Sequence, residues 1–189
     1  VGEGGATIEV ATGKTLTMNT GIKQSGSNRV LTKTGAGTLA LGSNNTVSKL
    51  VIKQGTVTDI IDGGYNQLPV TVAFEGGTLS DSNSEGMPGN TNKANFVVEE
   101  GKTGTLICDP RCDYTGKLTG KGTFTVNAAG VRNYFKGDWS GFEGTLIPGY
   151  QKGGSYDPSF DFNNAYGLPK ATLKLNADVT FNNNGNAVT

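Results

Sequence analysis

The sequence has no histidine among its 189 residues. Histidine is the commonest metal ligand and the usual proton shuttle near neutral pH, so its absence excludes zinc hydrolases and Ser-His-Asp catalysis. No apolar run approaches the roughly 20 residues that a membrane-spanning helix needs, so we expect no membrane insertion of this segment. No long stretch carries the stripe of an amphipathic helix either, which disfavours an α-helical fold.

The chain has no excess charge, because its 16 Lys and Arg residues balance 16 Asp and Glu residues. Nucleic-acid grooves and anionic membrane surfaces attract proteins with a basic excess, so we predict no nucleic-acid partner. The chain shows no signal peptide, yet it begins at Val1 rather than Met. We therefore expect a processed or excised piece of a longer protein.

Cysteine is also scarce. Cys108 and Cys112 are the only two, and they bracket Asp-Pro-Arg. We predict a disulfide between them, which would close a small loop in an oxidising compartment. The alternative is a redox or metal pair, although the spacing is not Cys-x-x-Cys and no other soft ligand exists to complete a site.

Glycine is abundant, with 30 residues, and Thr, Asn and Ser are common. This composition favours short strands joined by tight turns. Every Gly-Thr pair is followed by Leu, Val or Phe, and the pairs return after 18, 22, 27, 18 and 22 residues. The triads are Gly37-Thr38-Leu39, Gly55-Thr56-Val57, Gly77-Thr78-Leu79, Gly104-Thr105-Leu106, Gly122-Thr123-Phe124 and Gly144-Thr145-Leu146. A further step of 27 residues reaches Ala171-Thr172-Leu173.

This return predicts an all-β solenoid, a single-stranded parallel β-helix with roughly 18–27 residues per coil. A sandwich or barrel could also use such short strands, but it has no reason to repeat a triad. Stacked coils do, because they place equivalent residues above one another. We predict one continuous body of roughly nine coils over residues 1–189, with loop excursions near 80–95, 108–112, 131–142 and 148–164.

One stretch carries a more specific pattern. Leu31–Leu41, followed by Asn44-Asn45-Thr46 and Gly55-Thr56-Val57, resembles the autotransporter-associated β-strand repeat, also called the passenger-associated repeat. That family's pattern is roughly Lys-x-Gly-x-Gly-Thr-Leu-x-Leu, an Asn-rich turn and a closing Gly-Thr-Leu. Leu118–Val126 is a weaker echo of it. The resemblance implies a right-handed parallel β-helix on a secreted or surface-displayed protein of a Gram-negative bacterium.

The segment from Arg132 to Phe142 is the richest candidate for binding. Its Arg132, Tyr134, Asp138 and Trp139 combine aromatic rings with charged hydrogen-bonding groups, as a glycan-binding groove does. The alternative is structural: Phe135, Trp139 and Phe142 would pin a long turn onto the coil while Arg132 and Lys136 stay in solvent.

Asp81, Asn83 and Glu85 place oxygen ligands at alternate positions before a glycine, as at the start of a calcium loop. The twelfth position is Asn92 rather than a bidentate Glu, and Pro88 intrudes, so calcium is a weak prediction and we expect no other cofactor. Pairs such as Thr15-x-Thr17 and Thr123-x-Thr125 are found in ice-binding ladders, but their spacing here is irregular.

We assign no catalytic residue. Acid and cation candidates for a β-helix polysaccharide lyase or glycoside hydrolase are Asp109, Arg111, Asp113, Arg132 and Asp138, with Asp157 and Asp161 as less favoured acids. We expect instead a non-enzymatic, adhesin-like or stalk-like segment at the extracellular or outer-membrane surface of a Gram-negative bacterium. Its expected partners are glycans, a host or cell-surface protein, and neighbouring β-helix coils of the full-length chain. The alternative is part of a carbohydrate-active β-helix enzyme.

Overall fold

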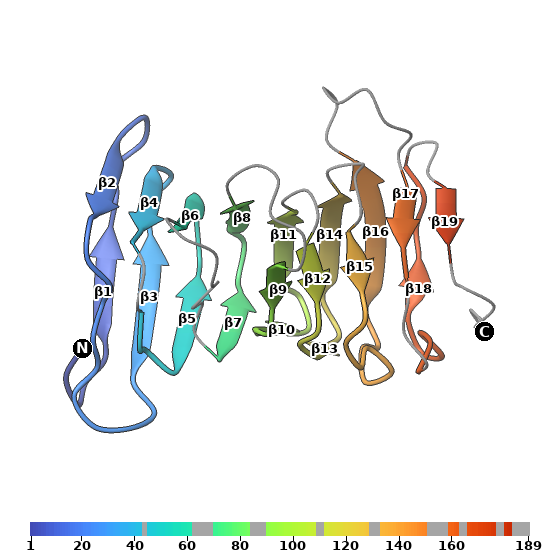
Figure 1. The fold of residues 1–189 in the computed structure, drawn as a ribbon, viewed down its shortest axis with the longest axis horizontal. Helices are drawn as coiled ribbons and strands as arrows, with labels where there is room; N and C mark the ends of the chain where they lie inside the picture. Colours follow the sequence, from blue (N-terminus) through green and yellow to red (C-terminus); the bar gives the residue numbers. More distant parts are fainter. Residues whose placement is uncertain are drawn as a thin grey trace.

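The computed structural model describes residues 1–42, 45–61, 70–83, 90–108, 112–128, 133–150, 159–162, 166–176 and 180–182. These residues form strands β1 to β19 and no helix. The strands lie side by side along one long axis, with the N-terminus at one end and the C-terminus near the other (Figure 1). Among these residues, therefore, there is no helix long and apolar enough to cross a membrane.

The strands form three sheets, which we call the first, second and third sheet. The first sheet has the order β1 (Ala6–Glu9), β3 (Val30–Thr34), β5 (Lys49–Ile52), β7 (Thr71–Phe74), β10 (Asn95–Val98) and β13 (Leu118–Gly120). The second runs β2 (Thr15–Met18), β4 (Thr38–Leu41), β6 (Thr56–Ile61), β8 (Thr78–Asn83), β11 (Thr103–Ile107), β14 (Thr123–Ala128), β16 (Thr145–Tyr150) and β18 (Thr172–Leu173). The third runs β9 (Asn90–Asn92), β12 (Cys112–Tyr114), β15 (Tyr134–Phe135), β17 (Ser159–Asp161) and β19 (Thr180–Asn182).

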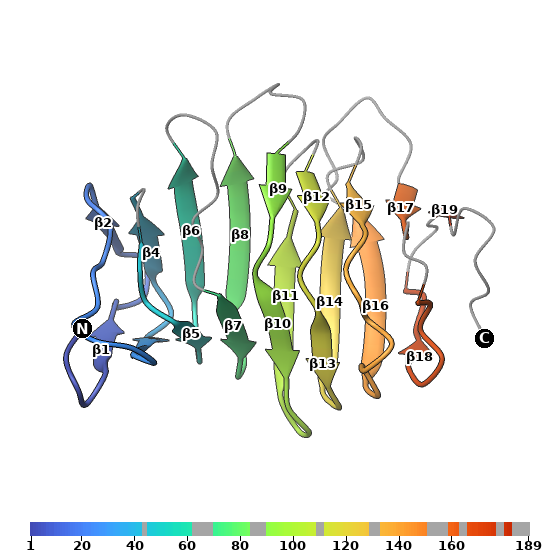
Figure 2. The ribbon, with the colours of Figure 1, turned by 60° about the horizontal axis from the view of Figure 1, so that its bottom comes forward.

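Every strand pair in these sheets is parallel, and the chain visits the sheets in turn before it moves on by one strand. Figure 2 shows this advance as successive arrows pointing the same way within each sheet. The predicted parallel β-helix is confirmed. The second sheet has eight strands in the described part of the chain, against roughly nine predicted coils.

The Gly-Thr corners align in the second sheet. Thr38 lies opposite Thr15 on one side and Thr56 on the other. The apolar residue of each triad points inward, because side chains alternate along a strand. Leu39, Val57, Leu79, Leu106 and Leu146 are fully buried in one continuous core.

One strand changes the register of this column. In β11, Leu106 pairs with Leu79 on one side and with Val126 on the other, so Gly104 comes to lie opposite Phe124. A Cβ on Gly104 would lie 2.4 Å from the Cβ of Phe74. Glycine is therefore required here because the Phe74 ring fills the space that a side chain would occupy.

The third sheet lies largely where the sequence predicts loop excursions. Strands β9, β12, β15 and β17 fall within or at the edge of those segments, and the remaining parts of them lie mostly outside the described residues. Aromatic rings fill the interior of these coils. Phe124 lies 5.2 Å from Phe74 and 5.9 Å from Phe96, while Tyr114 stacks on Phe135 at 5.1 Å, measured between ring centroids.

Candidate functional site

Trp139, the predicted glycan platform, lies in the core. Its exposed fraction is 0%, its ring lies 5.2 Å from Phe135 and 5.6 Å from Phe162, and its Nε1 donates a hydrogen bond to the carbonyl oxygen of Gly116 at 3.3 Å. A ring enclosed in this way offers no face to a sugar, so the prediction for Trp139 is wrong. Phe135 and Phe142 are also fully buried, as the alternative structural interpretation expects.

Asp138 stabilises the turn next to Trp139. Its Oδ1 accepts hydrogen bonds from the Ser140 hydroxyl at 2.6 Å and the Ser140 N–H at 3.1 Å, and the hydroxyl bond is the main reason that the pKa of Asp138 is lowered. Its backbone carbonyl accepts from the N–H of Leu118. Asp138 thus holds its own turn and the neighbouring coil. Arg132 lies outside the described residues.

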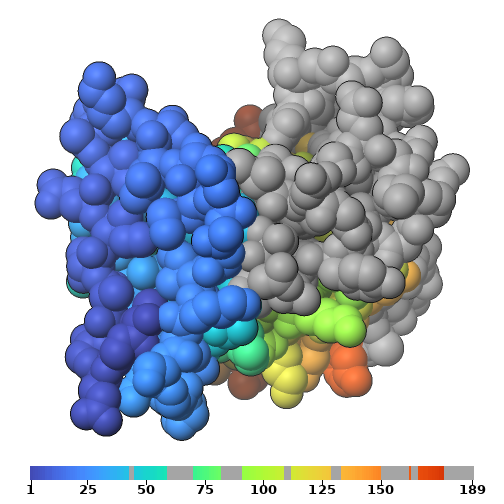
Figure 3. All heavy atoms as spheres, turned by 60° about the vertical axis from the view of Figure 1, so that its left-hand side comes forward, coloured from blue at the N-terminus to red at the C-terminus, as the bar shows by residue number. Residues whose placement is uncertain are grey.

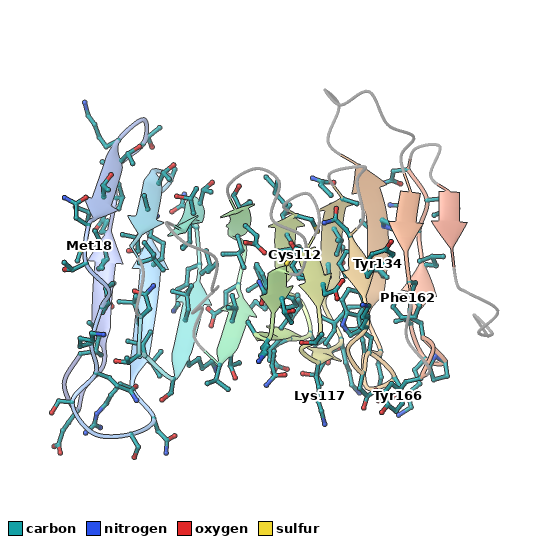
Figure 4. The ribbon with its side chains drawn as sticks, in the orientation of Figure 1. Met18, Cys112, Lys117, Tyr134, Phe162 and Tyr166 are labelled. Carbon is teal, nitrogen blue, oxygen red and sulfur yellow. The ribbon has the colours of Figure 1, made fainter. Side chains whose placement is uncertain are left out.

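Tyr134 belongs to a patch on the outer face of the third sheet, which we call the β12–β15 patch and define as Thr91, Asp113, Tyr134 and Lys136. Tyr134 and Thr91 flank Asp113 on neighbouring strands. Lys136 Nζ lies 2.7 Å from Asp113 Oδ2 and 5.2 Å from the centre of the Tyr134 ring. Figure 4 labels Tyr134 on this sheet.

These side chains face outward because their neighbours on the same strands face inward: Cys112, Tyr114 and Phe135 are fully buried. The exposed fractions of the Lys136 and Asp113 side chains are 40% and 29%, so both groups can reach solvent while they pair. A partly exposed ring beside a cation and a carboxylate suits a polar ligand with an apolar face. The patch is the best-supported surface site in the described part of the chain.

The sequence gave no warning of a second polar cluster, which lies inside the coil. Asp81 is 2% exposed, and its Oδ2 accepts hydrogen bonds from the Tyr114 hydroxyl at 2.9 Å and from Asn92 Nδ2 at 3.2 Å. Cys112 Sγ approaches the same oxygen at 3.9 Å. A buried carboxylate needs such donors because it has lost its hydration. Burial, with Asp81 as a further cause, raises the pKa of Tyr114 well above its ordinary value.

The inward position of Asp81 corrects the calcium-loop prediction at that residue. Along β8, Leu79 and Asp81 both point into the core, and the Asp81 oxygen is held by Tyr114 and Asn92. The side chain of Asn83 and the whole of Glu85 lie outside what the structure describes. Within the described ranges no three His, Cys, Asp or Glu residues are grouped so that they could hold a metal ion.

The two cysteines correct another prediction. Cys108 and Cys112 are both buried, and the structure has no disulfide between them. The Cys112 thiol is directed at Asp81 and at the carbonyl oxygen of Asp113, at 3.9 and 3.8 Å. The predicted small loop therefore exists without a covalent bridge, because the thiol turns toward polar groups of the interior.

Lys33, the lysine of the repeat motif, is fully buried. Its Nζ donates to the carbonyl oxygens of Thr34 and Gly35 at 2.7 Å each and of Gln54 at 3.2 Å. Loss of hydration lowers the pKa of this ammonium group. Lys33 therefore joins two successive turns from inside and is not available to a ligand.

Of the remaining catalytic candidates, Asp109, Arg111 and Asp157 lie outside the described residues. Asp161 pairs with Tyr134 through its backbone, but its side chain is not described. Asp113 and Tyr134 are therefore the only two of the predicted residues that the structure brings together on one described surface.

The fold and its register define the chain as a parallel β-solenoid protein. Comparisons with known proteins give no narrower assignment, since no family model, curated protein or solved structure matches the chain.

Proposed function

We propose that this chain is a non-enzymatic segment of a β-helical scaffold that a Gram-negative bacterium secretes or displays on its surface. The observation that carries the proposal is the unbroken stack of parallel strands around one filled core. Such a stack is a rigid rod whose length grows with the number of coils, which suits the presentation of a surface at a distance.

The roles of the motif residues support the resemblance to the autotransporter-associated repeat. Lys33 joins consecutive turns, as described above. Gly35 has a φ of +73°, and a Cβ there would lie 2.3 Å from the carbonyl oxygen of Val10. A Cβ on Gly37 would lie 2.2 Å from the carbonyl oxygen of Ala11. Each conserved-type position of the pattern thus has a stacking role, and secretion and surface display follow from that resemblance.

The β12–β15 patch is the surface that this scaffold would present, and a glycan is the ligand class that suits it. The described carboxylates already hold structure: Asp113 pairs with Lys136, Asp138 bonds Ser140, and Asp81 is buried. The alternative function, a carbohydrate-active enzyme, would use two carboxylates facing each other across about 5–10 Å.

Location is tested on cells that produce the protein. An antibody raised against the 189-residue chain should label intact, unpermeabilised cells or detect the protein in the medium. Mild protease treatment of whole cells should remove the cell-bound signal. Labelling that appears only after permeabilisation would contradict the proposal.

Activity is tested by combining a glycan array with a reducing-end assay on a panel of polysaccharides. We expect no release of reducing ends, and we expect any array binding to weaken on Tyr134→Ala and to persist on the control Tyr166→Ala, whose residue is 60% exposed elsewhere. Turnover that disappears on Asp113→Asn would establish the enzyme instead.

A further inference from the structure

Both ends of the second sheet are open in the described part of the chain. β2 forms one edge and β18 the other. An edge strand leaves a row of backbone N–H and C=O groups without partners in its own sheet, which favours pairing with another strand. Figure 3 shows the first coils, in blue, at the surface of the N-terminal end.

The two edges also leave apolar side chains in water. Leu16 on β2 is 39% exposed, and Leu175, just after β18, is 57% exposed. Elsewhere in the second sheet the corresponding leucines, such as Leu39 and Leu79, are fully buried by the coil next to them. Covering each end with one more coil would bury Leu16 and Leu175 in the same way.

The two edges match each other in sequence. β2 begins Thr15-Leu16, and β18 consists of Thr172-Leu173. β18 already pairs with β16 by placing Thr172 opposite Thr145 and Leu173 opposite Leu146. β2 pairs with β4 in the same motif register, Thr15 opposite Thr38 and Leu16 opposite Leu39. A parallel contact between β18 and β2 would therefore repeat a register that the molecule already uses.

Charge complementarity indicates what occupies these ends. Ion pairs follow the corner between the first and second sheets, with Lys53 3.6 Å from Glu75 and Lys121 3.1 Å from Glu143. The last pair joins Glu143 to Lys170 at 3.5 Å, so the row ends on a cation. The same corner begins on an anion, Glu9, which ends β1. Lys170 of one copy would thus meet Glu9 of another, and the net charge of zero removes long-range repulsion between copies.

We infer that this β-helix stacks head to tail on a second copy of the same chain, with β18 of one copy pairing in parallel with β2 of the next. The contact is heterologous, so it leaves an open end on each side of a dimer and continues into linear assemblies. The inference does not depend on the proposed function, since it concerns the ends of the rod and not the β12–β15 patch.

Sedimentation velocity of the 189-residue chain at rising concentration tests the inference, together with negative-stain images of the same samples. We expect the weight-average mass to rise with concentration past that of a dimer, and we expect short rods in the images. A chain that stays monomeric at its highest soluble concentration would overturn the inference, as would a closed dimer.

Two variants separate end contacts from side contacts. Leu16→Lys places a charge on the edge strand and should abolish association. Val70→Lys is the control, because Val70 is 66% exposed but lies away from both ends of the second sheet, and it should associate like the parent. Association that is lost only in Val70→Lys would show side-by-side contact and overturn the inference.

A charge-swap mixture tests the register. Glu9→Lys and Lys170→Glu should each weaken self-association about tenfold or more, because each creates a like-charge contact at every junction. Mixing the two variants in equal amounts should restore association, since Lys at position 9 then meets Glu at position 170, and Glu9 meets Lys170. Variants with native circular dichroism spectra whose mixture stays monomeric would contradict the pairing of these ends.

Discussion

Lys33 is a buried cation without a carboxylate partner among its printed contacts, and carbonyl oxygens of two coils hold it. Lys33→Met would leave three carbonyl groups short of a donor while it removes the cost of burying a charge. An unsatisfied buried polar group costs about 1–3 kcal/mol, so the lost bonds should outweigh the gain. We predict a net loss of about 1–3 kcal/mol in the free energy of unfolding, measured by urea denaturation.

The matched control is Lys121→Met, because Lys121 belongs to the weaker echo of the motif but is exposed, in an ion pair with Glu143. Its urea midpoint should stay close to that of the parent. If Lys33→Met were more stable than the parent, burial of the charge would dominate and the role assigned to Lys33 would be wrong.

Tyr114 links stability to alkaline pH. Burial raises its pKa well above the ordinary value of 10.0, so an unfolded Tyr114 ionises near that pH while the folded one stays neutral. Stability should therefore fall as the pH rises beyond about 10, because ionisation favours the unfolded state. Tyr114→Phe should lose about 1.5–3 kcal/mol at neutral pH with its bond to Asp81, and should then fall less steeply.

The measurement is the urea midpoint of parent and variant at a series of pH values from neutral to about 11. The difference between the two proteins isolates Tyr114 from the other alkaline titrations. Parallel curves for parent and variant would contradict the coupling.

Trp139, the only tryptophan, reports directly on the site that the sequence proposed for glycans. Because it is fully buried, we predict a blue-shifted emission and little quenching by acrylamide until urea unfolds the chain. Emission typical of a water-exposed indole, with efficient quenching of the folded protein, would return Trp139 to the surface.

Residue roles were the hardest to predict from sequence. The segment from Arg132 to Phe142 predicts its own two alternatives, and only burial chooses the structural one for Trp139. Asp81 resembles a loop ligand in sequence, yet alternation along β8 turns it inward with Leu79. That alternation was the available signal, since an acid two residues after a buried leucine shares its face when the strand continues.

At the scale of the strand, β11 adjusts the register between its two neighbours, and Gly104 makes this possible. Gly104→Ala would force a Cβ to within 2.4 Å of Phe74, so we predict a loss of about 1–3 kcal/mol, measured by urea denaturation. Gly141→Ala is the control, because its nearest neighbour would be Thr119 Cγ2 at 3.6 Å, an ordinary contact. Equal effects of the two changes would contradict the packing assigned to Gly104.

The strands of the second sheet could be predicted because each carries the same Gly-Thr-apolar corner. The third sheet could not, since strands such as β15, with only Tyr134 and Phe135, are too short to show alternation. Their pairing depends on strands one coil away, such as β12. Contacts of that kind are invisible in a local pattern.

At the scale of the whole molecule, the repeat predicts a solenoid because stacking is the physical reason for a triad to return. The interval between corners varies because coils with a third strand need more chain. The interior chemistry also changes along the rod, from aliphatic residues such as Leu39 and Leu50 to rings such as Phe124 and Trp139. Composition alone does not place those rings.

The central claim is that the corners of successive coils lie above one another in parallel register. Methyl NOE spectroscopy of the folded chain tests it most directly through the buried column Leu39, Val57, Leu79 and Leu106. We predict strong NOEs from Leu39 to Val57, from Val57 to Leu79 and from Leu79 to Leu106, and none from Leu39 to Leu106. Missing neighbour NOEs, or the close Hα–Hα contacts of antiparallel strands between these segments, would contradict the β-helix.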